Sequence, residues 1–333
     1  MRVGISILNA AMILNEHKYR PITGTVLTIG RQSVGLTAET TDILLQRMGV
    51  PKRDVQYQVD EQTIGVSRAL PYITQESFFA AFTDAKVASL DVSAYENADV
   101  VCDMQGTIPE QYLGYADFIY NGSCLDNIFD AAAALRNMTL LAKPDGRIYS
   151  FEQGNSHPTA YLKYSADWFM DYYALNEFAD CKTYVANSPN TLGTPLIPGT
   201  DAQTFPLPTP SPHDLIIYNY NPYVVHASGD GYDCSSVELF SRYEIHCIAE
   251  KAASSTHDRN PIQKHYRVDR WHNKICLKSA RKFRDSQRPN FSNDVDFDVA
   301  SIPRIDSSDY PQQMRCVAVF PSGYPLADRK INS

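Results

Sequence analysis

The 333-residue sequence has no apolar run that approaches the roughly 18 consecutive apolar residues of a membrane span. Its apolar start is interrupted by Asn9 and Asn15 and lacks the small-residue cleavage pattern of a secretory signal, so we expect residues 1–20 to be a docking segment. The seven cysteines are odd in number, widely spaced and never arranged as C-x-x-C, which argues against a disulfide framework and a zinc site. These absences predict a protein of the reducing cytoplasm, without a membrane span and without a metal site.

Several catalytic signatures are also missing. The phosphate-loop pattern G-x-x-x-x-G-K does not occur, which excludes nucleoside triphosphate hydrolysis of that type. No G-x-S-x-G motif is present, which disfavours an α/β-hydrolase.

Positive charge is scarce. The formal net charge of −8 disfavours nucleic-acid binding, because neutralising phosphates requires a surplus of Lys and Arg on the binding face. The one basic stretch, 265–288, is followed by an acidic run at 293–309. We interpret the basic stretch as a solvated helix balanced by that tail, in preference to an anion-binding site. The oligomeric state stays open, a homo-oligomer included.

What the sequence does contain is a regular alternation of short apolar runs with helix-like segments. The run 25–30 is β-branched, apolar throughout and ends in Gly30, as expected of a buried parallel strand. The segment 37–49 predicts a helix with Thr37 as N-cap and Gly49 as stop. The further predicted elements are helices at 73–84 and 127–142 and strands at 86–92, 98–104, 116–122 and 146–152. This alternation predicts β-α-β units and a parallel sheet.

The second half of the chain is less regular. Residues 188–214 hold so many Pro, Gly and Thr that we expect a long surface loop. Beyond it, 214–224 and 241–252 are expected to be strands. We therefore expect one main domain over 21–255 and a partly irregular C-terminal extension over 256–333.

Polar side chains stand where three predicted strands end. Asp91, Asp103 and Asn121 each occupy such a position. In an open α/β sheet the ligand lies at the carboxyl ends of the strands, so these side chains are expected to face it. A carboxylate suits the paired hydroxyls of a ribose, and a second acid or amide can accept a hydrogen bond from an adenine amine. The pattern favours an adenosine-containing ligand.

The segment 89–152 resembles the middle of class I S-adenosylmethionine-dependent methyltransferases. There, two successive strands end in acids, and a later helix leads into a turn that is Leu141-Ala142-Lys143-Pro144-Asp145-Gly146 here. The chain looks most similar to a bacterial branch with a G-R-Q first-strand motif and a later Tyr- and Asn-rich helix, which is 165–185 here. The resemblance implies an α/β, Rossmann-like sheet, mostly parallel, with seven strands of which the last is antiparallel, and helices on both faces. The strand at 241–252 would be the antiparallel one.

The resemblance also implies a cofactor, S-adenosylmethionine, and a reaction, methyl transfer to a small-molecule or saccharide acceptor. The residues expected around the cofactor are Gly30, Arg31, Gln32, Asp91, Asp103, Met104, Asn121 and Gly122. The family's first strand opens a glycine-rich turn, G-x-G-x-G, whereas this chain has G-R-Q-S-V-G over 30–35. Arg31 is therefore expected either to pair with the cofactor's methionine carboxylate or to serve as a structural ion-pair partner.

The candidate acid-base residues are Asp126, His157 and Glu152. Related sequences place a Glu-His pair after the fourth strand, where this chain has Cys124 to Asn127. Asp126 is either a substrate-side base or the N-cap of the following helix, and we favour the cap. His157 is at least as well explained as an exposed loop residue.

Four tyrosines could line an acceptor pocket, although aromatic residues at helical spacing more often belong to the core. They are Tyr161, Tyr164, Tyr172 and Tyr173.

Two other functions remain open. A non-catalytic binding or assembly protein with the same fold is suggested by the altered turn at 30–35 and the missing Glu-His pair. An NAD-dependent Rossmann oxidoreductase would share the sheet and a ribose-binding acid, but Gly30 lacks the partner glycines of the nicotinamide fingerprint.

Overall fold

The computed structural model describes most of the chain, in nine stretches. They are 4–61, 70–94, 96–155, 160–188, 213–220, 242–263, 266–267, 270–291 and 314–321. Our expectations for His157, for the larger part of the proline-rich loop (189–212) and for the acidic run (293–309) lie outside the described residues.

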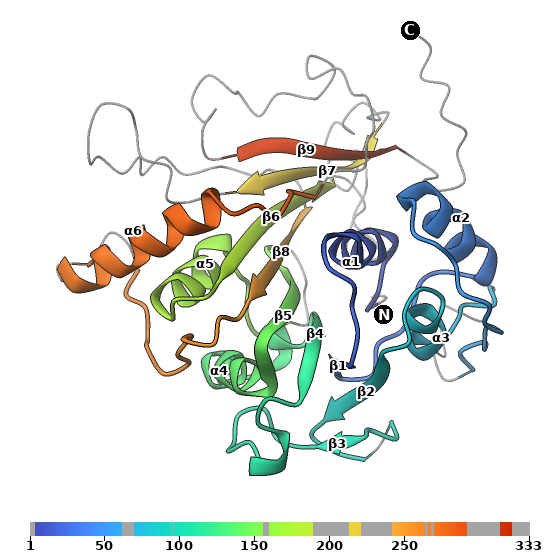
Figure 1. Ribbon diagram of the computed structural model, residues 1–333, viewed down its shortest axis with the longest axis horizontal. Helices are drawn as coiled ribbons and strands as arrows, with labels where there is room; N and C mark the ends of the chain where they lie inside the picture. The colour runs from blue at the N-terminus through green and yellow to red at the C-terminus, as the bar shows by residue number, and fades with distance from the viewer. Residues whose placement is uncertain are drawn as a thin grey trace, which may run out of the picture.

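A nine-stranded sheet forms the centre of the protein, in the order β3-β2-β1-β4-β5-β8-β6-β7-β9 (Figure 1). The strands are β1 (Thr25–Ile29), β2 (Lys86–Asp91), β3 (Val100–Val101), β4 (Ala116–Gly122), β5 (Ala142–Gln153), β6 (Asp180–Ser188), β7 (His213–Tyr220), β8 (Arg242–Glu250) and β9 (Met314–Pro321). The five strands β3, β2, β1, β4 and β5, in this spatial order, pair in parallel with their neighbours. Strand β8 pairs antiparallel with both β5 and β6. The seven strands β3-β2-β1-β4-β5-β8-β6 have the order and directions of the class I methyltransferase sheet, so the predicted fold is confirmed. Strands β7 and β9 extend that sheet beyond β6.

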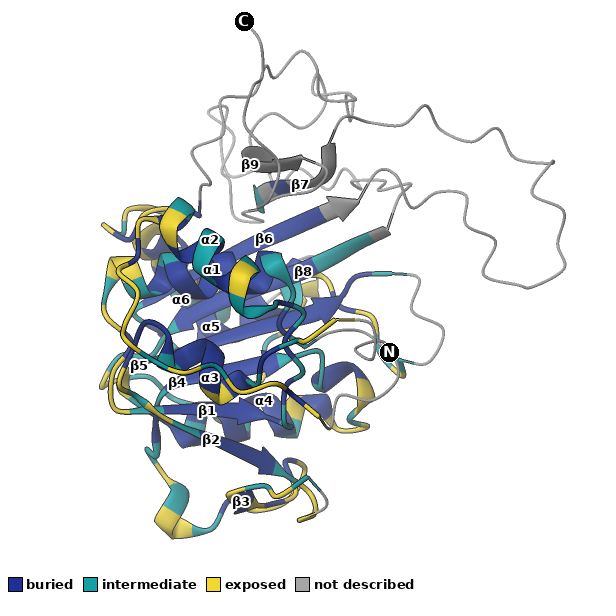
Figure 2. Ribbon diagram, turned by 90° about the vertical axis from the view of Figure 1, so that its right-hand side faces the viewer, coloured by how far each residue is buried: buried dark blue, intermediate teal, exposed yellow. Residues whose placement is uncertain are grey.

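Helices cover both faces of the sheet, as predicted (Figures 1 and 2). They are α1 (Ile7–Tyr19), α2 (Ala38–Met48), α3 (Gln75–Ala80), α4 (Ala131–Leu141), α5 (Ala166–Leu175) and α6 (Arg270–Arg284). Helices α1, α2 and α3 share one apolar cluster with one face of the strands, and α4, α5 and α6 share another with the opposite face. Among the described helices, none combines the length and the apolar content that crossing a bilayer requires.

Local chemistry accounts for the best-predicted helix. Thr37 is the N-cap of α2, since its side chain accepts a hydrogen bond from the backbone N–H of Thr40. Gly49 ends the helix in the left-handed conformation, with φ at +63°, which glycine adopts without steric cost.

The segment 165–185 was predicted wrongly as one helix. It forms α5, which ends at Leu175, and then β6, which starts at Asp180. Asn176 caps the helix, and the β-branched and aromatic run that follows pairs with β8 over its full length. Tertiary pairing therefore overrides the aromatic periodicity that favoured a longer helix.

Candidate functional site

Three of the predicted site residues, Gly30, Asp91 and Asn121, lie at the carboxyl edge of the sheet. Ile29, the last residue of β1, is the register partner of Leu90 in β2 and of Asn121 in β4. The backbone N–H of Gly30 donates to the Leu90 carbonyl at 2.7 Å. The strand order reverses between β1 and β4, and this is where open α/β sheets bind ligands.

Gly30 and Asp91 have the geometry of an accessible ligand edge. Gly30 has a φ of +70°, a left-handed conformation that favours glycine. Asp91 is half-buried, and one of its carboxylate oxygens accepts a hydrogen bond from the Ser93 N–H at 3.0 Å. Within the described residues this is the one hydrogen bond found for the carboxylate, so it retains acceptor capacity.

Asp103 and Met104 have different environments. Asp103 is exposed, and its carboxylate accepts from the Gln105 N–H at 2.9 Å. Met104 is buried in the apolar cluster on the α4 side, and its carbonyl accepts from the side chain of Asn137. Asp103 therefore lies on the surface beyond β3, whereas Met104 packs in the core.

Arg31 forms an ion pair with Asp60. Their closest N–O distance is 2.6 Å, and the Asp60 side chain is only 1% exposed. Of the two roles predicted for Arg31, the geometry corresponds to the structural ion pair. To bind a ligand carboxylate, Arg31 would have to share its guanidinium with Asp60 or leave it.

Gln32 fills the space beside the altered turn. Its side-chain Nε2 donates to the Ile29 carbonyl at 2.7 Å and to the Gly30 carbonyl at 3.2 Å. A Cβ added to Gly4 or Gly122 would overlap its Oε1, so the two glycines leave the room that this side chain occupies. Gln32 thus covers the end of β1, where the methyltransferases that the sequence resembles have a glycine-rich turn.

Asn121 and Glu152 form a buried polar pair that holds the loop after β4. Asn121 Nδ2 donates to Glu152 Oε1 at 2.7 Å, and the backbone N–H groups of Leu125 and Asp126 donate to the same carboxylate at 3.1 and 3.2 Å. Burial, and then the nearby charge of Asp126, raises the pKa of Glu152 well above its usual range. Glu152 is fully buried, so its contacts fix the loop.

Asp126 is not the N-cap of α4. It lies in a 3₁₀ turn, Leu125–Asn127, where its carboxylate accepts from the Ser123 hydroxyl at 2.7 Å. The N-cap is Asp130, which accepts from the Ala133 N–H at 3.0 Å. Both aspartates precede the alanine-rich run. Because the 3₁₀ turn Leu125–Asn127 comes first, α4 starts at Ala131, four residues after the predicted start at Asn127. The predictions of Asp126 as the N-cap and of the helix start at Asn127 were therefore wrong.

The core interpretation of the tyrosines is correct for Tyr172 and Tyr173, whereas Tyr164 belongs to the core and also lines a cavity at the start of α5. Tyr164, Tyr172 and Tyr173 are buried in the apolar cluster of α4 and α5. The Tyr164 hydroxyl also donates to the Leu125 carbonyl at 2.8 Å, which ties α5 to the loop after β4. Tyr161 is 74% exposed.

The sequence pattern did not identify two residues that shape this edge. The Cys124 Sγ donates to the Ile29 carbonyl at 2.8 Å, and burial raises the pKa of this thiol. Gln75, at the start of α3, accepts from the Gln32 backbone N–H at 2.9 Å. Both contacts join residues more than 40 positions apart, and no local motif encodes them.

In the described part of the chain, no group of three or more His, Cys, Asp or Glu side chains could hold a metal ion.

No family model matches the sequence, and no curated protein matches it. Among solved structures, the chain is similar to the 1,6-didemethyltoxoflavin-N1-methyltransferase of Burkholderia thailandensis, with 12% identity, a TM-score of 0.33, and 74% of this chain and 78% of that chain covered. It is similar to the Haemonchus contortus phosphoethanolamine N-methyltransferase 2, with 14% identity, a TM-score of 0.35, and 73% and 52% covered. The YcgJ protein of Bacillus subtilis gives 10% identity, a TM-score of 0.36, and 74% and 99% covered. At TM-scores this low the fold assignment rests on the strand order and directions.

Proposed function

We propose that the protein transfers the methyl group of S-adenosylmethionine to a small-molecule acceptor, saccharides included. The observation that carries the proposal is the carboxyl edge of the sheet. Gly30 follows β1, Asp91 ends β2 and Asn121 is the second-last residue of β4, at the point where the strand order reverses.

The residues at this edge fit the adenosine part of the cofactor. Asp91 has acceptor capacity for the two ribose hydroxyls, and exposed Asp103 can accept from an adenine amine. Gly30 lets the backbone approach closely. When bound, the cofactor supplies an electrophilic methyl group on a sulfonium. The methionine part of the cofactor requires the Gln32 side chain to rotate away from Gly122, with Arg31 then near its carboxylate.

The loop after β4 would orient the acceptor. Glu152 and Asn121 hold the backbone at Leu125 and Asp126, so their role is positioning. Asp126 is our candidate for accepting a proton from an acceptor hydroxyl, after turning from Ser123. His157 stays a second candidate for that proton.

A non-catalytic binding protein is the second candidate function, and one observation favours it. The side chains of Gln32 and Cys124 both donate to the Ile29 carbonyl and close the end of β1. If they do not move, the methionine part of the cofactor has no place there.

Calorimetry with S-adenosylmethionine, S-adenosylhomocysteine and NAD separates these functions. We expect heat with the first two and none with NAD. Heat with NAD alone would support the oxidoreductase, and no heat with any of the three would leave the non-catalytic protein.

The variant Asp91→Ala should weaken S-adenosylhomocysteine binding by about 1.5 to 3 kcal/mol, since hydrogen bonds to a charged group are lost. The matched control is Asp84→Ala, an exposed aspartate before the other end of β2, and its affinity should equal that of the wild type. Equal affinities for both variants would contradict ribose binding by Asp91.

A further inference from the structure

A cavity of about 330 Å³ lies between the start of α4 and the start of α5. Its lining comes from two segments, 129–132 and 162–168, which follow the loops after β4 and β5. The volume is at the lower end of the range for small-molecule sites, so it suits one compact ligand.

The apolar lining is mainly aromatic. Tyr164 and Trp168 pack edge to face with ring centroids 5.0 Å apart, and Trp168 packs in the same way on Phe169 behind it at 4.9 Å. These contacts fix the ring positions on the α5 side. Phe129 lines the cavity from the α4 side and is 86% exposed, although solvent exposure of so large an apolar ring is unfavourable. A planar ring between Phe129 and Trp168 would cover both.

The charges lining the cavity favour an anionic substituent on that ring. Lys163 contributes a positive charge, and its Nζ also donates to the Ala160 carbonyl at 3.4 Å. The N-cap of α5 is Ser165, whose side chain makes no capping hydrogen bond, and the Trp168 N–H donates to the Ser165 carbonyl at 3.3 Å. The Ala166 N–H at the helix start keeps donor capacity next to the cavity, while Asp167 places a carboxylate in the same first turn. Asp130 is the carboxylate of the lining, and its charge is already engaged at the N-terminus of α4, where it accepts from Ala133.

Hydrogen bonds join one wall of the cavity to the loop after β4. The backbone N–H groups of Tyr161 and Leu162 donate to the Asp126 carbonyl at 2.8 and 3.2 Å, and the Tyr164 hydroxyl donates to the Leu125 carbonyl. One wall of the cavity is thus bonded to the turn that Asn121 and Glu152 hold.

We infer that this cavity binds a planar aromatic acid, with the ring between Phe129 and Trp168 and the anionic group at Lys163 and the N-terminus of α5. On the proposed function, which this identification of the ligand presupposes, the aromatic acid is the methyl acceptor. Binding in the cavity can be measured without the cofactor.

The test uses 4-nitrobenzoate, whose nitrophenyl ring quenches tryptophan fluorescence. The chain has two tryptophans, so the variant Trp271→Phe leaves Trp168 as the reporter inside the cavity wall. In that background we expect saturable quenching by 4-nitrobenzoate. The uncharged 4-nitrobenzyl alcohol should bind about tenfold more weakly, since it lacks the charge-assisted contact.

Two variants with matched controls locate the probe. Phe129→Ala should weaken 4-nitrobenzoate binding by about fivefold through the lost ring contact, whereas Tyr161→Ala, which removes another exposed aromatic ring outside the lining, should not. Lys163→Met should weaken binding of the acid and leave binding of the alcohol unchanged, with the exposed Lys274→Met on α6 as its control. Absent or non-saturable quenching, or equal losses in Phe129→Ala and Tyr161→Ala, would overturn the inference.

S-adenosylhomocysteine calorimetry on the same protein keeps the two proposals apart. Binding of 4-nitrobenzoate without S-adenosylhomocysteine binding would retain the cavity and reject the methyltransferase. The reverse result would reject the cavity as an aromatic-acid site and retain the methyltransferase.

Discussion

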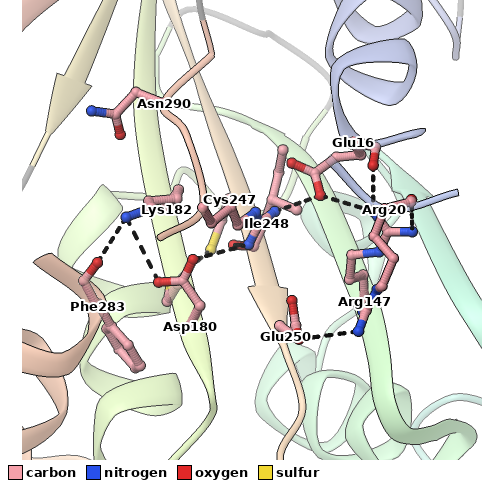
Figure 3. Close-up of polar contacts among 12 residues, drawn as sticks. Glu16, Arg20, Arg147, Asp180, Lys182, Cys247, Ile248, Glu250, Phe283 and Asn290 are labelled. Carbon is pink, nitrogen blue, oxygen red and sulfur yellow. Dashed lines mark hydrogen bonds and ion pairs between the residues drawn. The ribbon is translucent and has the colours of Figure 1, made fainter. Parts of the chain in front are cut away.

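The two edges of the sheet hold their buried polar groups in different ways. At the amino edge, where β5 and β6 begin, Arg288 lies 2.7 Å from Glu16 of α1 and 3.4 Å from Asp180 of β6. Arg147 of β5 lies 3.3 Å from Glu16, and Figure 3 labels Glu16, Arg147 and Asp180 of this cluster. All four side chains are buried. Ion pairs between buried charged side chains therefore connect α1, β5, β6 and the segment after α6.

At the carboxyl edge, hydrogen bonds of amides, a thiol and backbone groups hold the end of β1 and the loop after β4, beside one ion pair, Arg31 with Asp60. Glu152 carries a raised pKa and accepts from Asn121 and two backbone N–H groups, and Gln32 covers the end of β1. An ion pair in the protein interior is costly to open, because each charge loses its partner without regaining water. Hydrogen bonds between neutral groups are weaker and can be exchanged for those of a ligand. The amino edge is therefore suited to holding the fold, and the carboxyl edge to changing when a ligand binds.

The largest expected effect comes from breaking the amino edge. Arg288→Met removes the cation that Glu16 and Asp180 share and leaves Glu16 with Arg147 at 3.3 Å and Asp180 with Lys182 at 3.8 Å, so it should lower the free energy of unfolding by about 3 kcal/mol in urea titrations. The control is Arg284→Met, whose partner Asp285 is also exposed, and it should change stability by less than about 0.5 kcal/mol. Similar values for the two variants would remove the distinction between the edges.

A pH effect of intermediate size is expected from His246, which pairs with Phe151 between the two edges. Burial lowers its pKa from 6.5 to about 3, so the folded protein keeps this imidazole neutral while the unfolded chain takes up a proton below 6.5. Its contribution to stability is full above pH 6.5 and is lost as the pH falls toward 3, roughly 2 kcal/mol between pH 7 and pH 5.

Urea titrations at several pH values test this. His246→Phe keeps a ring to stack on Phe151 and should flatten the stability profile between pH 7 and pH 5. The control is His257→Gln, which replaces a half-buried histidine in the loop before α6. An unchanged slope in His246→Phe would mean that this side chain is not held neutral.

At the carboxyl edge, Glu152→Gln should have a smaller effect that also depends on pH. The raised pKa of Glu152 means that its contribution is greatest below pH 4.5 and is lost as the pH rises from there toward the folded pKa. The variant lacks the acceptor for the Asp126 N–H, so it should cost about 1 kcal/mol at pH 5 and less at pH 8. A cost that grows with pH, or one equal to that of the exposed control Glu39→Gln, would contradict the raised pKa.

The smallest stability change is expected from Gln32→Ala, with an opposite effect on binding. Losing the hydrogen bonds to the Ile29 and Gly30 carbonyls should cost about 0.5 kcal/mol, because the Ile29 carbonyl keeps the Cys124 thiol as a donor. The same change empties the space beside Gly122, so on the proposed function S-adenosylhomocysteine should bind severalfold more tightly than to the wild type or to the exposed control Gln46→Ala. Weaker binding would show that Gln32 contacts the ligand and does not obstruct it.

The sequence by itself determined the elements whose signals are local. Thr37 and Gly49 bound a helix through their own side-chain and backbone chemistry, and the strand at 116–122 follows from its apolar pattern. The order of such elements along the chain, with the family resemblance, was enough to predict the seven-stranded sheet and the reversed strand β8.

Only the tertiary structure decided what the polar side chains at the site do. Arg31 turns to Asp60, Gln32 fits between Gly4 and Gly122, and Glu152 serves the loop after β4, because each partner comes from a distant part of the chain. Likewise, the helix α5 ends at Leu175 and the strand β6 begins at Asp180 because β8 is there to pair with β6. Local propensity is encoded within a few residues, whereas the partner of a buried charge or amide depends on how the whole sheet assembles.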